Sequence, residues 1–179
     1  SGIDEKTLVF FLSDNGGPTR ELTSSNSLMQ NKKGNLYEGG LRIPFLVQWP
    51  GTIPGGKIYQ QPVLSLDIFA TAIAQANITT PKKQALDGVN LLPFLTGEET
   101  GRPHEELFWR VGNKGALRAG DWKLVRNPGR DEGDAWQLYR INEDIAESDD
   151  QAAKEPEKLS DLIERWEARN SEMVEPLWR

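Results

Sequence analysis

The sequence has no cysteine and only one histidine, His104, among its 179 residues. Without cysteine, these residues contain no disulfide, no thiolate metal site and no thiol nucleophile. No apolar run approaches the roughly 20 residues of a membrane span. The first residues also lack the basic and apolar regions of a signal peptide, so we expect any export signal to lie upstream of residue 1. These absences predict that the chain has no membrane partner.

An excess of positive charge is absent too, because the formal net charge is −6. A protein of this charge is not drawn to phosphate backbones, and we expect no nucleic-acid partner. What remains is the composition of a globular protein, with 37% hydrophobic and 27% charged residues and six tryptophans. That composition predicts a packed core.

The first half of the chain combines apolar segments with one long polar connection. Residues 7–12 form a continuous apolar run, typical of a strand that is buried on both faces, as in the middle of a parallel sheet. Residues 45–49 are the matching run nearby. The polar segment 16–35 between them is longer than most structureless loops, and such loops usually have a function.

A helix is expected to follow, with Asp67 as its N-cap, Ala76 as its last residue and Asn77 ending it. Its apolar residues recur at helical spacing, so one face is expected to be buried. These residues are Ile68, Phe69, Ala72, Ile73 and Ala76.

The second half has the pattern of a small antiparallel sheet followed by a helix. The predicted strands are residues 106–111, 115–118, 122–125 and 137–140. Turns are expected at Gly112 and Gly120, and a last helix is expected to begin at Pro156. An apolar stripe on that helix is predicted to pack on the sheet; it contains Leu159, Leu162, Ile163 and Trp166. The boundary between the two halves is expected near residues 97–103.

The strongest candidate for chemistry is the sequence Ser-Asp-Asn-Gly-Gly at residues 13–17, directly after the first apolar run. In open α/β sheets, ligands bind beyond the carboxyl ends of strands. Asp14 and Asn15 would place two hard oxygen donors there, which suit Ca²⁺ or Mg²⁺. The alternative is an ordinary turn in which Asp and Asn bond their own backbone, and the local pattern alone favours it.

A second candidate is the pair Lys32 and Lys33, which precedes Gly34 and the Tyr-Glu-Gly-Gly run at residues 37–40. A lysine beside a divalent cation fits an oxyanion site, where fixed positive charge stabilises the charge that develops on oxygen. Two adjacent lysines in a polar loop are otherwise solvent-facing, which is the ordinary case. Support from other residues has to decide between the two.

That support comes from a resemblance to the second half of the type I sulfatase (arylsulfatase) signature, in the alkaline phosphatase superfamily. The resemblance covers nearly the whole chain. The matching segments are residues 13–16 (Ser-Asp-Asn-Gly), 33–34 (Lys-Gly), 37–40 (Tyr-Glu-Gly-Gly), Arg42, Pro44, 49–51 (Trp-Pro-Gly), 67–69 (Asp-Ile-Phe), 87–88 (Asp-Gly), 117–124 (Leu-Arg-Ala-Gly-Asp-Trp-Lys-Leu) and 138–139 (Leu-Tyr).

The resemblance implies an α/β fold: the C-terminal part of a mixed α/β sulfatase domain, at residues 1–100, followed by a small antiparallel β-sheet module with a C-terminal helix, at residues 101–179. It also implies that Asp14 and Asn15 ligate Ca²⁺ and that Lys33 contacts the sulfate. Lys32 does not align with the family pattern and receives no role.

Other residues are interpreted as structural. Arg42 is expected to fix the loop through backbone or carboxylate contacts. His104 lies outside the matched motifs and is expected to be structural or at the rim of the substrate site. The tryptophans at 109, 122 and 136 are expected in the core of the β module.

Sulfatases of this family act through a formylglycine made from Cys or Ser in a Cys/Ser-x-Pro/Ala-x-Arg motif, and this sequence contains no such motif. The expectation is therefore a sulfatase fragment, truncated near residue 1 and inactive by itself. One alternative is a phosphonate or phosphodiester hydrolase of the same superfamily. Another is a non-catalytic carbohydrate-binding or interaction module.

The family also implies a sulfated small molecule or glycan as substrate and a periplasmic or extracellular location. The apolar runs at 7–12 and 45–49 are expected to lack their covering elements in this chain. Bare apolar faces favour association. We therefore expect the fragment to form homo-oligomers through its N-terminal half.

Overall fold

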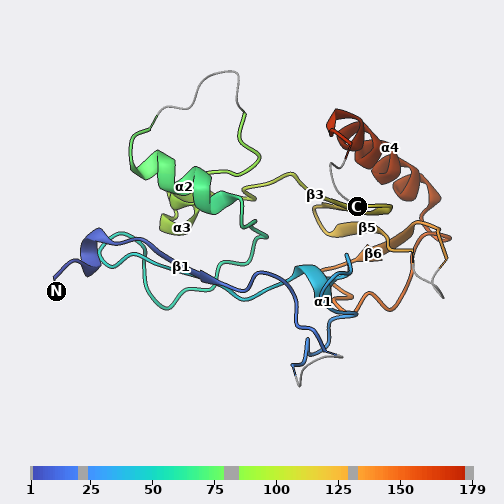
Figure 1. Ribbon diagram of the computed structural model, residues 1–179, viewed down its shortest axis with the longest axis horizontal. Helices are drawn as coiled ribbons and strands as arrows, with labels where there is room; N and C mark the ends of the chain where they lie inside the picture. Colours follow the sequence, from blue (N-terminus) through green and yellow to red (C-terminus); the bar gives the residue numbers. More distant parts are fainter. Residues whose placement is uncertain (1, 20–23, 79–84, 129–132, 176–179) are drawn as a thin grey trace. The chain divides into compact units, whose positions relative to one another are not determined.

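The computed structural model describes residues 2–19, 24–78, 85–128 and 133–175 (Figure 1). It has a mixed α/β fold with two antiparallel sheets and a C-terminal helix. The elements in chain order are the 3-10 helix η1 (Asp4–Lys6), β1 (Val9–Leu12), α1 (Glu38–Leu41), β2 (Phe45–Gln48), α2 (Asp67–Gln75), α3 (Leu92–Thr96), β3 (Glu106–Val111), β4 (Lys114–Ala119), β5 (Trp122–Arg126), β6 (Gln137–Arg140) and α4 (Pro156–Glu172). No helix in the described part of the chain is long and apolar enough to cross a bilayer.

The chain divides into two compact units that are not contiguous in sequence. The hairpin unit consists of Ser1–Leu12 and Pro44–Glu105, and the sheet unit consists of Ser13–Ile43 and Glu106–Arg179. Residues 13–43 therefore group with the C-terminal sheet, although the sequence placed them with the first half. The predicted division into domains 1–100 and 101–179 concerns the complete protein and stays a prediction.

The sheet unit is built on a four-stranded antiparallel meander in the order β3-β4-β5-β6. The predicted strands are confirmed, with ends that differ by one residue. Two-residue connections join β3 to β4 and β4 to β5, and each begins with a glycine, Gly112 or Gly120, at positive φ. Glycine adopts this conformation without steric cost, so the sequence specifies these turns.

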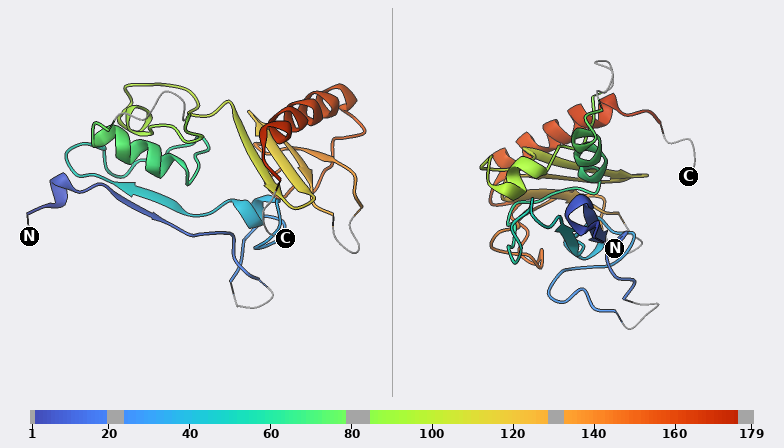
Figure 2. Two further views of the ribbon diagram at one scale, coloured as in Figure 1. Left: turned by 45° about the horizontal axis from the view of Figure 1, so that its top comes forward. Right: turned by 90° about the vertical axis from the view of Figure 1, so that its left-hand side faces the viewer.

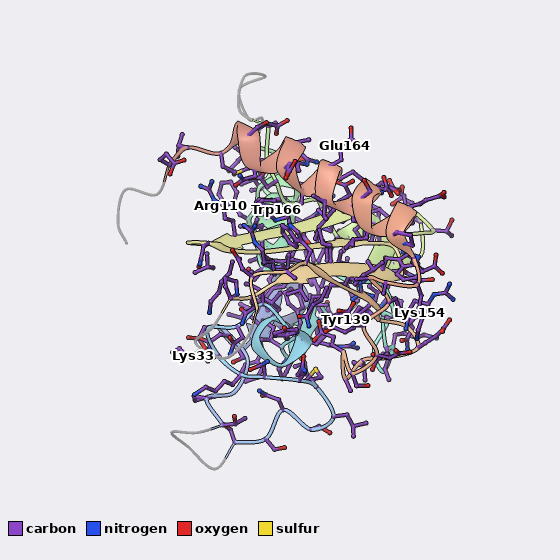
Figure 3. All side chains as sticks on the ribbon, turned by 90° about the vertical axis from the view of Figure 1, so that its right-hand side faces the viewer. Lys33, Arg110, Tyr139, Lys154, Glu164 and Trp166 are labelled. Atoms are coloured by element: carbon purple, nitrogen blue, oxygen red, sulfur yellow. The ribbon has the colours of Figure 1, made fainter. Side chains whose placement is uncertain are left out.

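Helix α4 covers one face of this sheet, as predicted. Leu162 and Trp166 of α4 are buried against Leu117, Leu124 and Leu138 of the sheet. Figure 3 shows Trp166 between the helix and the sheet, whereas Glu164 points away from the sheet. The amphipathic stripe read from the sequence is therefore the face that packs.

The other face of the sheet is covered by residues 36–41, which include α1. Leu36 and Tyr37 form a second buried cluster with Ala116, Val125 and Tyr139 of the sheet. Figure 2 shows α1 and α4 on opposite sides of the sheet. The alternation of side chains along each strand thus gives the sheet two buried faces.

In the hairpin unit, β1 pairs with β2, the neighbour expected from the sequence, but the pair is antiparallel. The strand is not buried on both faces in this chain, because Val9 and Phe11 are exposed, Phe11 to 70%, which agrees with the expectation that the chain does not cover this apolar run. The opposite face is half-buried, and Phe10 meets Phe45 edge-on there. An apolar run specifies a strand but neither its direction nor which face is covered.

Helix α2 also departs from the prediction in its buried face. Ala70 and Thr71 are buried, whereas Phe69 of the expected apolar face is exposed. The helix ends at Gln75, one residue before the predicted Ala76, which is its C-cap. Asn77 then breaks the helix with a positive φ of 54°, and the Ile78 amide donates to the Ile73 carbonyl over 3.0 Å.

Asp67 is the first residue of α2 and is not its N-cap. Its fully buried carboxylate accepts the backbone N–H groups of Leu64 and Val89, at 2.7 and 2.9 Å. The carboxylate is used for these tertiary bonds because a buried charge needs several donors. The prediction of Asp67 as a cap was therefore wrong.

The burial of Leu162 predicts a large effect on stability. Leu162→Ala should lower the free energy of unfolding by about 2–5 kcal/mol, since the side chain is 0% exposed and leaves a cavity among leucines. Urea unfolding followed by tryptophan fluorescence measures this. Leu28→Ala is the matched control, because Leu28 is 75% exposed in the same unit and its loss should change little. Equal midpoints for the two variants would contradict the packing of α4.

Candidate functional site

The site predicted from the sequence begins at the turn that follows β1. The Ser13 hydroxyl donates to the Asn15 carbonyl over 2.9 Å, and Asn15 Nδ2 donates to the Gly16 carbonyl over 3.0 Å. Local backbone bonds of an ordinary turn are therefore present. The Asp14 carboxylate takes no part in them: it is exposed and has no hydrogen-bond or ion-pair partner among the described residues.

This turn is held by backbone contact with α1. The Gly16 amide donates to the Gly40 carbonyl over 3.0 Å, and a side chain at Gly16 would overlap the carbonyl oxygen of Gly39. Side chains at Gly39 and Gly40 would likewise overlap the carbonyls of Gln30 and Asn35. The three glycines are needed because the backbones touch, which explains the Gly-Gly of residues 39–40 and the Gly16 of the earlier motif.

Asn26 ties the loop together and was missed from the sequence. Its Nδ2 donates to the carbonyls of Asn31 and Gly39, both at 2.8 Å, and to that of Gly17 at 3.3 Å. Its Oδ1 accepts the Gly17 amide at 2.9 Å. Asn26 is one of many polar residues in segment 16–35, and no local pattern singles it out.

Lys33 lies on the same loop, and its side chain is exposed. Its backbone amide donates to the Gly17 carbonyl over 3.4 Å, which places it beside the turn that contains Asp14 and Asn15. The structure therefore brings the loop segments of all three predicted site residues together. Their roles toward metal and sulfate stay predictions.

A buried ionic chain joins α1 to the sheet. Lys123 Nζ on β5 lies 2.8 Å from Glu38 Oε1 and 2.8 Å from Glu147 Oε1, and the Lys123 side chain is 0% exposed. Glu147 Oε2 also accepts the Glu38 amide at 2.6 Å. Arg42 lies 3.8 Å from the second oxygen of Glu38, which confirms the expected carboxylate contact of Arg42.

Electrostatics favour this arrangement because the signs alternate along Arg42, Glu38, Lys123 and Glu147. Burial raises the pKa of Glu147, although the charge of Lys123 and the amide of Glu38 oppose that rise. A buried carboxylate without such partners would be strongly disfavoured. Glu147 lies in segment 142–154, whose acidic composition is typical of a solvated surface, so its burial could not be read from the sequence.

Polar side chains of the sheet fix the loop at further points. The Leu36 amide donates to Asn127 Oδ1 over 3.2 Å, and Lys114 Nζ donates to the Gly34 carbonyl over 2.7 Å. The Tyr37 hydroxyl donates to Gln137 Oε1. The loop that carries Lys33 is therefore bonded to β4, β6 and the end of β5.

His104 belongs to the hairpin unit and acts there as a structural residue. Its Nε2 lies 2.9 and 3.0 Å from the two carboxylate oxygens of Asp67, and both side chains are buried. The imidazole thus satisfies the buried Asp67 carboxylate. This outcome supports the structural interpretation of His104.

The tryptophans at 109, 122 and 136 are packed rather than open. Trp136 lies edge-on to Trp166, and Trp109 packs against the cluster on the α1 side. The guanidinium of Arg140 lies over the Trp122 ring, 4.6 Å from its centre. These contacts agree with the expected core role.

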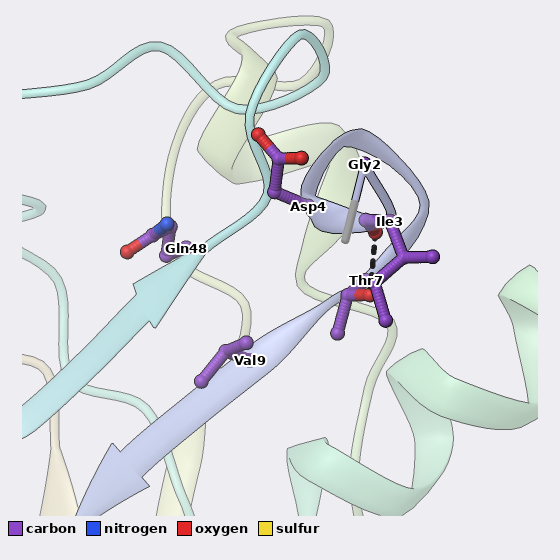
Figure 4. A pocket seen from close by; sticks show the side chains of 6 residues that line it. All are labelled: Gly2, Ile3, Asp4, Thr7, Val9 and Gln48. Atoms are coloured by element: carbon purple, nitrogen blue, oxygen red, sulfur yellow. Dashed lines mark hydrogen bonds between the residues drawn. The ribbon is translucent and has the colours of Figure 1, made fainter.

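A hollow beside β1 is not a candidate for this site (Figure 4). Asp4 is the one ionisable side chain in it, and none of the predicted site residues lines it. The lining residues are Gly2, Ile3, Asp4, Thr7, Val9 and Gln48.

The donor set decides which metal chemistry the chain can support. Asp14 and Asn15 offer hard oxygens, which fit part of a Ca²⁺ shell of six to eight ligands. The described residues contain no group of three or more His, Cys, Asp or Glu side chains that could hold a metal. Among the described residues, Asp14 and Asn15 thus fit part of a site for a hard divalent cation, and the binding of Ca²⁺ there stays a prediction.

The backbone contact between Gly16 and α1 can be tested by its effect on stability. Gly16→Ala should lower the free energy of unfolding of the sheet unit by about 1–3 kcal/mol, because the new methyl group forces the backbones apart. Gly133→Ala is the control, since a Cβ there meets nothing within 4 Å. Chemical denaturation of both variants makes the comparison, and an undisturbed Gly16→Ala protein would refute the contact.

Comparison with known proteins places this chain in a family. A family model described as Sulfatase matches residues 1–78. Steryl-sulfatase of Mus musculus is 36% identical over 114 residues, which cover 60% of this chain and 18% of that protein. A sulfatase of Formosa agariphila is 30% identical over 195 aligned residues, which cover 95% of this chain and 34% of that protein.

Solved structures that resemble this chain include sulfatases as well. The crystal structure of Ps i-CgsB has a TM-score of 0.84 at 30% identity and covers 98% of this chain and 39% of that one. PsFucS1 sulfatase from Pseudoalteromonas sp. shares the fold with a TM-score of 0.80 at 23% identity, over 95% of this chain and 38% of that one. The chain thus spans between about a fifth and two fifths of the length of these proteins. The matches together show that this chain belongs to the sulfatase family and corresponds to part of the length of a family member.

Proposed function

We propose that this chain is the part of a calcium-dependent sulfate-ester hydrolase that supplies the metal ligands Asp14 and Asn15 and the sulfate-binding cation Lys33. Hydrolysis of sulfate esters is the activity of the family to which the chain belongs. The observation that carries the proposal is the contact of the loop segments: Gly16 bonds Gly40, and Lys33 bonds Gly17. Two oxygen donors and a lysine therefore lie on one compact loop.

Each residue has a distinct part in the proposed reaction. Asp14 and Asn15 would bind Ca²⁺, which when present would polarise an oxygen of the sulfate group. Lys33 would hold the ester by its fixed positive charge and stabilise the charge that develops as the ester bond breaks. The sequence has neither cysteine nor a Ser-x-Pro/Ala-x-Arg motif, so we place the formylglycine nucleophile outside this chain.

For the substrate we favour a sulfated glycan over a sulfated small molecule. Ps i-CgsB, at 30% identity over 98% of this chain, was crystallised with the oligosaccharide k-i-k-neocarrahexaose. Steryl-sulfatase is more similar, at 36% identity, but its match covers 60% of this chain. Parallel assays with a sulfated oligosaccharide and a sulfated sterol distinguish the two, and faster turnover of the sterol would overturn this choice.

Two other functions remain as outcomes of the assays. Phosphonate or phosphodiester hydrolysis would appear as turnover of those esters in place of sulfate esters. A non-catalytic carbohydrate-binding module would bind a glycan through this chain alone without turnover by any longer form. We also propose a periplasmic or extracellular location, which fractionation of the producing cells tests.

The site assignment is tested in the complete enzyme. Asp14→Ala should abolish turnover and weaken Ca²⁺ binding, because the hard cation loses its anionic ligand.

Lys33→Ala should lower turnover about a hundredfold and leave Ca²⁺ bound, as expected for the loss of one preorganised charge contact. Turnover kinetics and calcium titration measure both effects.

Exposed residues of the hairpin unit serve as controls, Glu98→Ala for the aspartate and Lys57→Ala for the lysine. Undiminished metal affinity in Asp14→Ala would remove the metal assignment. A Lys33→Ala enzyme within about twofold of wild type would return Lys33 to the solvent-exposed interpretation.

The isolated chain is expected to be inactive and self-associated. It should bind Ca²⁺ weakly, because it supplies two of the six to eight oxygens that the ion prefers. Exposed Val9, Phe11 and Leu46 support association through the hairpin unit. All three statements can be tested on one sample. Calorimetric titration measures calcium binding, an aryl-sulfate assay measures activity, and light scattering measures association. Metal-dependent turnover, tight calcium binding or a monodisperse monomer would each refute its own statement.

A further inference from the structure

The buried Lys123 has a position that core stability alone does not explain. It lies on β5 in the middle of the sheet, fully buried, with Glu38 and Glu147 each 2.8 Å away. Burying charges is costly, and well-packed apolar residues in place of a buried ion pair are often as stable or more so. Ionic groups in such places are attributed in some proteins to structural specificity. We therefore ask which part of the structure is positioned by the ion pairs of Lys123 with Glu38 and Glu147.

The contacts lead from Lys123 to the candidate site. Lys123 and Glu147 both hold Glu38, the first residue of α1, by its carboxylate and by its backbone amide. The next residues of α1, Gly39 and Gly40, touch the turn at Gly16. A displacement of Glu38 would therefore move the backbone against which the turn of Asp14 and Asn15 rests.

Other hydrogen bonds from the sheet reach this loop at residues 34–37, just before α1. Lys123 and Glu147 hold α1 itself, at Glu38. The apolar cluster around Leu36 and Tyr37 attracts the loop to the sheet, but apolar contact is non-directional and permits sliding. The Lys123 ammonium lies 2.8 Å from both carboxylates, and the Glu38 amide donates a hydrogen bond to Glu147, so Glu38 is tied to the sheet unit through its side chain and through its backbone. The partly exposed Arg42 completes the chain at 3.8 Å from Glu38 and contributes less, because its side chain is 53% exposed.

We propose that Lys123 and Glu147 are positioning residues, which set the register of α1 on the sheet and thereby fix the turn that carries Asp14 and Asn15 and the loop that carries Lys33. Their effect on catalysis rests on the function proposed above. Their effect on the order of the loop does not, and it can be measured in this chain.

The test measures backbone amide hydrogen exchange in the 179-residue chain. Lys123→Met keeps the length of the side chain and removes its charge. Lys123→Met combined with Glu38→Gln and Glu147→Gln removes all three charges, so that no unpaired buried carboxylate remains. Amides of residues 13–19 and 30–41 should exchange at least tenfold faster in both variants, while those of β4 and β5 keep their protection.

Lys154→Met is the control, because Lys154 forms an exposed pair with Asp149 and should leave exchange unchanged. Wild-type exchange in the loop of the neutral triple variant would overturn the proposal. So would loss of folding in both variants, because the charges would then hold the sheet itself together.

The complete enzyme gives a second readout. The triple variant should lose at least tenfold in kcat with little change in KM, as expected when bound substrate meets a misplaced site. If loop exchange rises but Lys33→Ala leaves turnover unchanged, positioning of the loop holds and the proposed function fails. If Lys33→Ala impairs turnover but loop exchange is unaffected, the function holds and the positioning proposal fails.

Discussion

The salt bridges of Lys123 with Glu38 and Glu147 connect two motifs that lie far apart in the sequence. Glu38 stands in the Tyr-Glu-Gly-Gly run, and Lys123 stands in the Leu-Arg-Ala-Gly-Asp-Trp-Lys-Leu segment at 117–124. The two motifs are one structural feature, because a carboxylate buried under α1 requires a cation on the sheet. This contact, together with the apolar cluster of Leu36 and Tyr37, joins residues 13–43 to the C-terminal sheet, with which they form one unit. Without it, the loop would have only apolar packing and a few polar bonds to hold it.

Glycines allow a closer approach than these ion pairs do. Because glycine has no Cβ, the backbones of two segments can touch. Gly16, Gly39 and Gly40 leave no room for a Cβ, and Asn26 bonds the backbone groups that meet there. In this turn the Asp14 carboxylate is exposed, whereas Asn15 is half-buried and uses its Nδ2 to bond the Gly16 carbonyl. Compact backbone packing thus leaves the carboxylate of Asp14 open to solvent, as the predicted metal site requires.

The sequence predicted the sheet unit well and the hairpin unit less well, for a physical reason. Glycine turns separate β3, β4 and β5, and α4 has one apolar stripe, so the local signals of the sequence agree with the fold there. The run at residues 7–12 is apolar on both faces, and the sequence pattern does not encode its pairing direction or its cover. At the site, Asp14, Asn15 and Lys33 came from the family resemblance. Asn26 and Glu147 look like ordinary loop residues, and only the fold shows what they bind.

A site assembled from exposed loop residues depends on how much freedom the loop has already lost. Ordering one residue costs about 1–2 kcal/mol in backbone entropy, and a flexible loop would incur that cost when it binds metal and ester. In the sheet unit, the folding of β5 and β6 has already fixed the loop through Lys123, Gln137 and Asn127. Binding energy is then available for the transition state, in which a misplacement of about 1 Å can cost a hundredfold in rate. On the proposed function, the antiparallel sheet, which supplies none of the predicted site residues, would contribute to turnover by holding the loop that carries them.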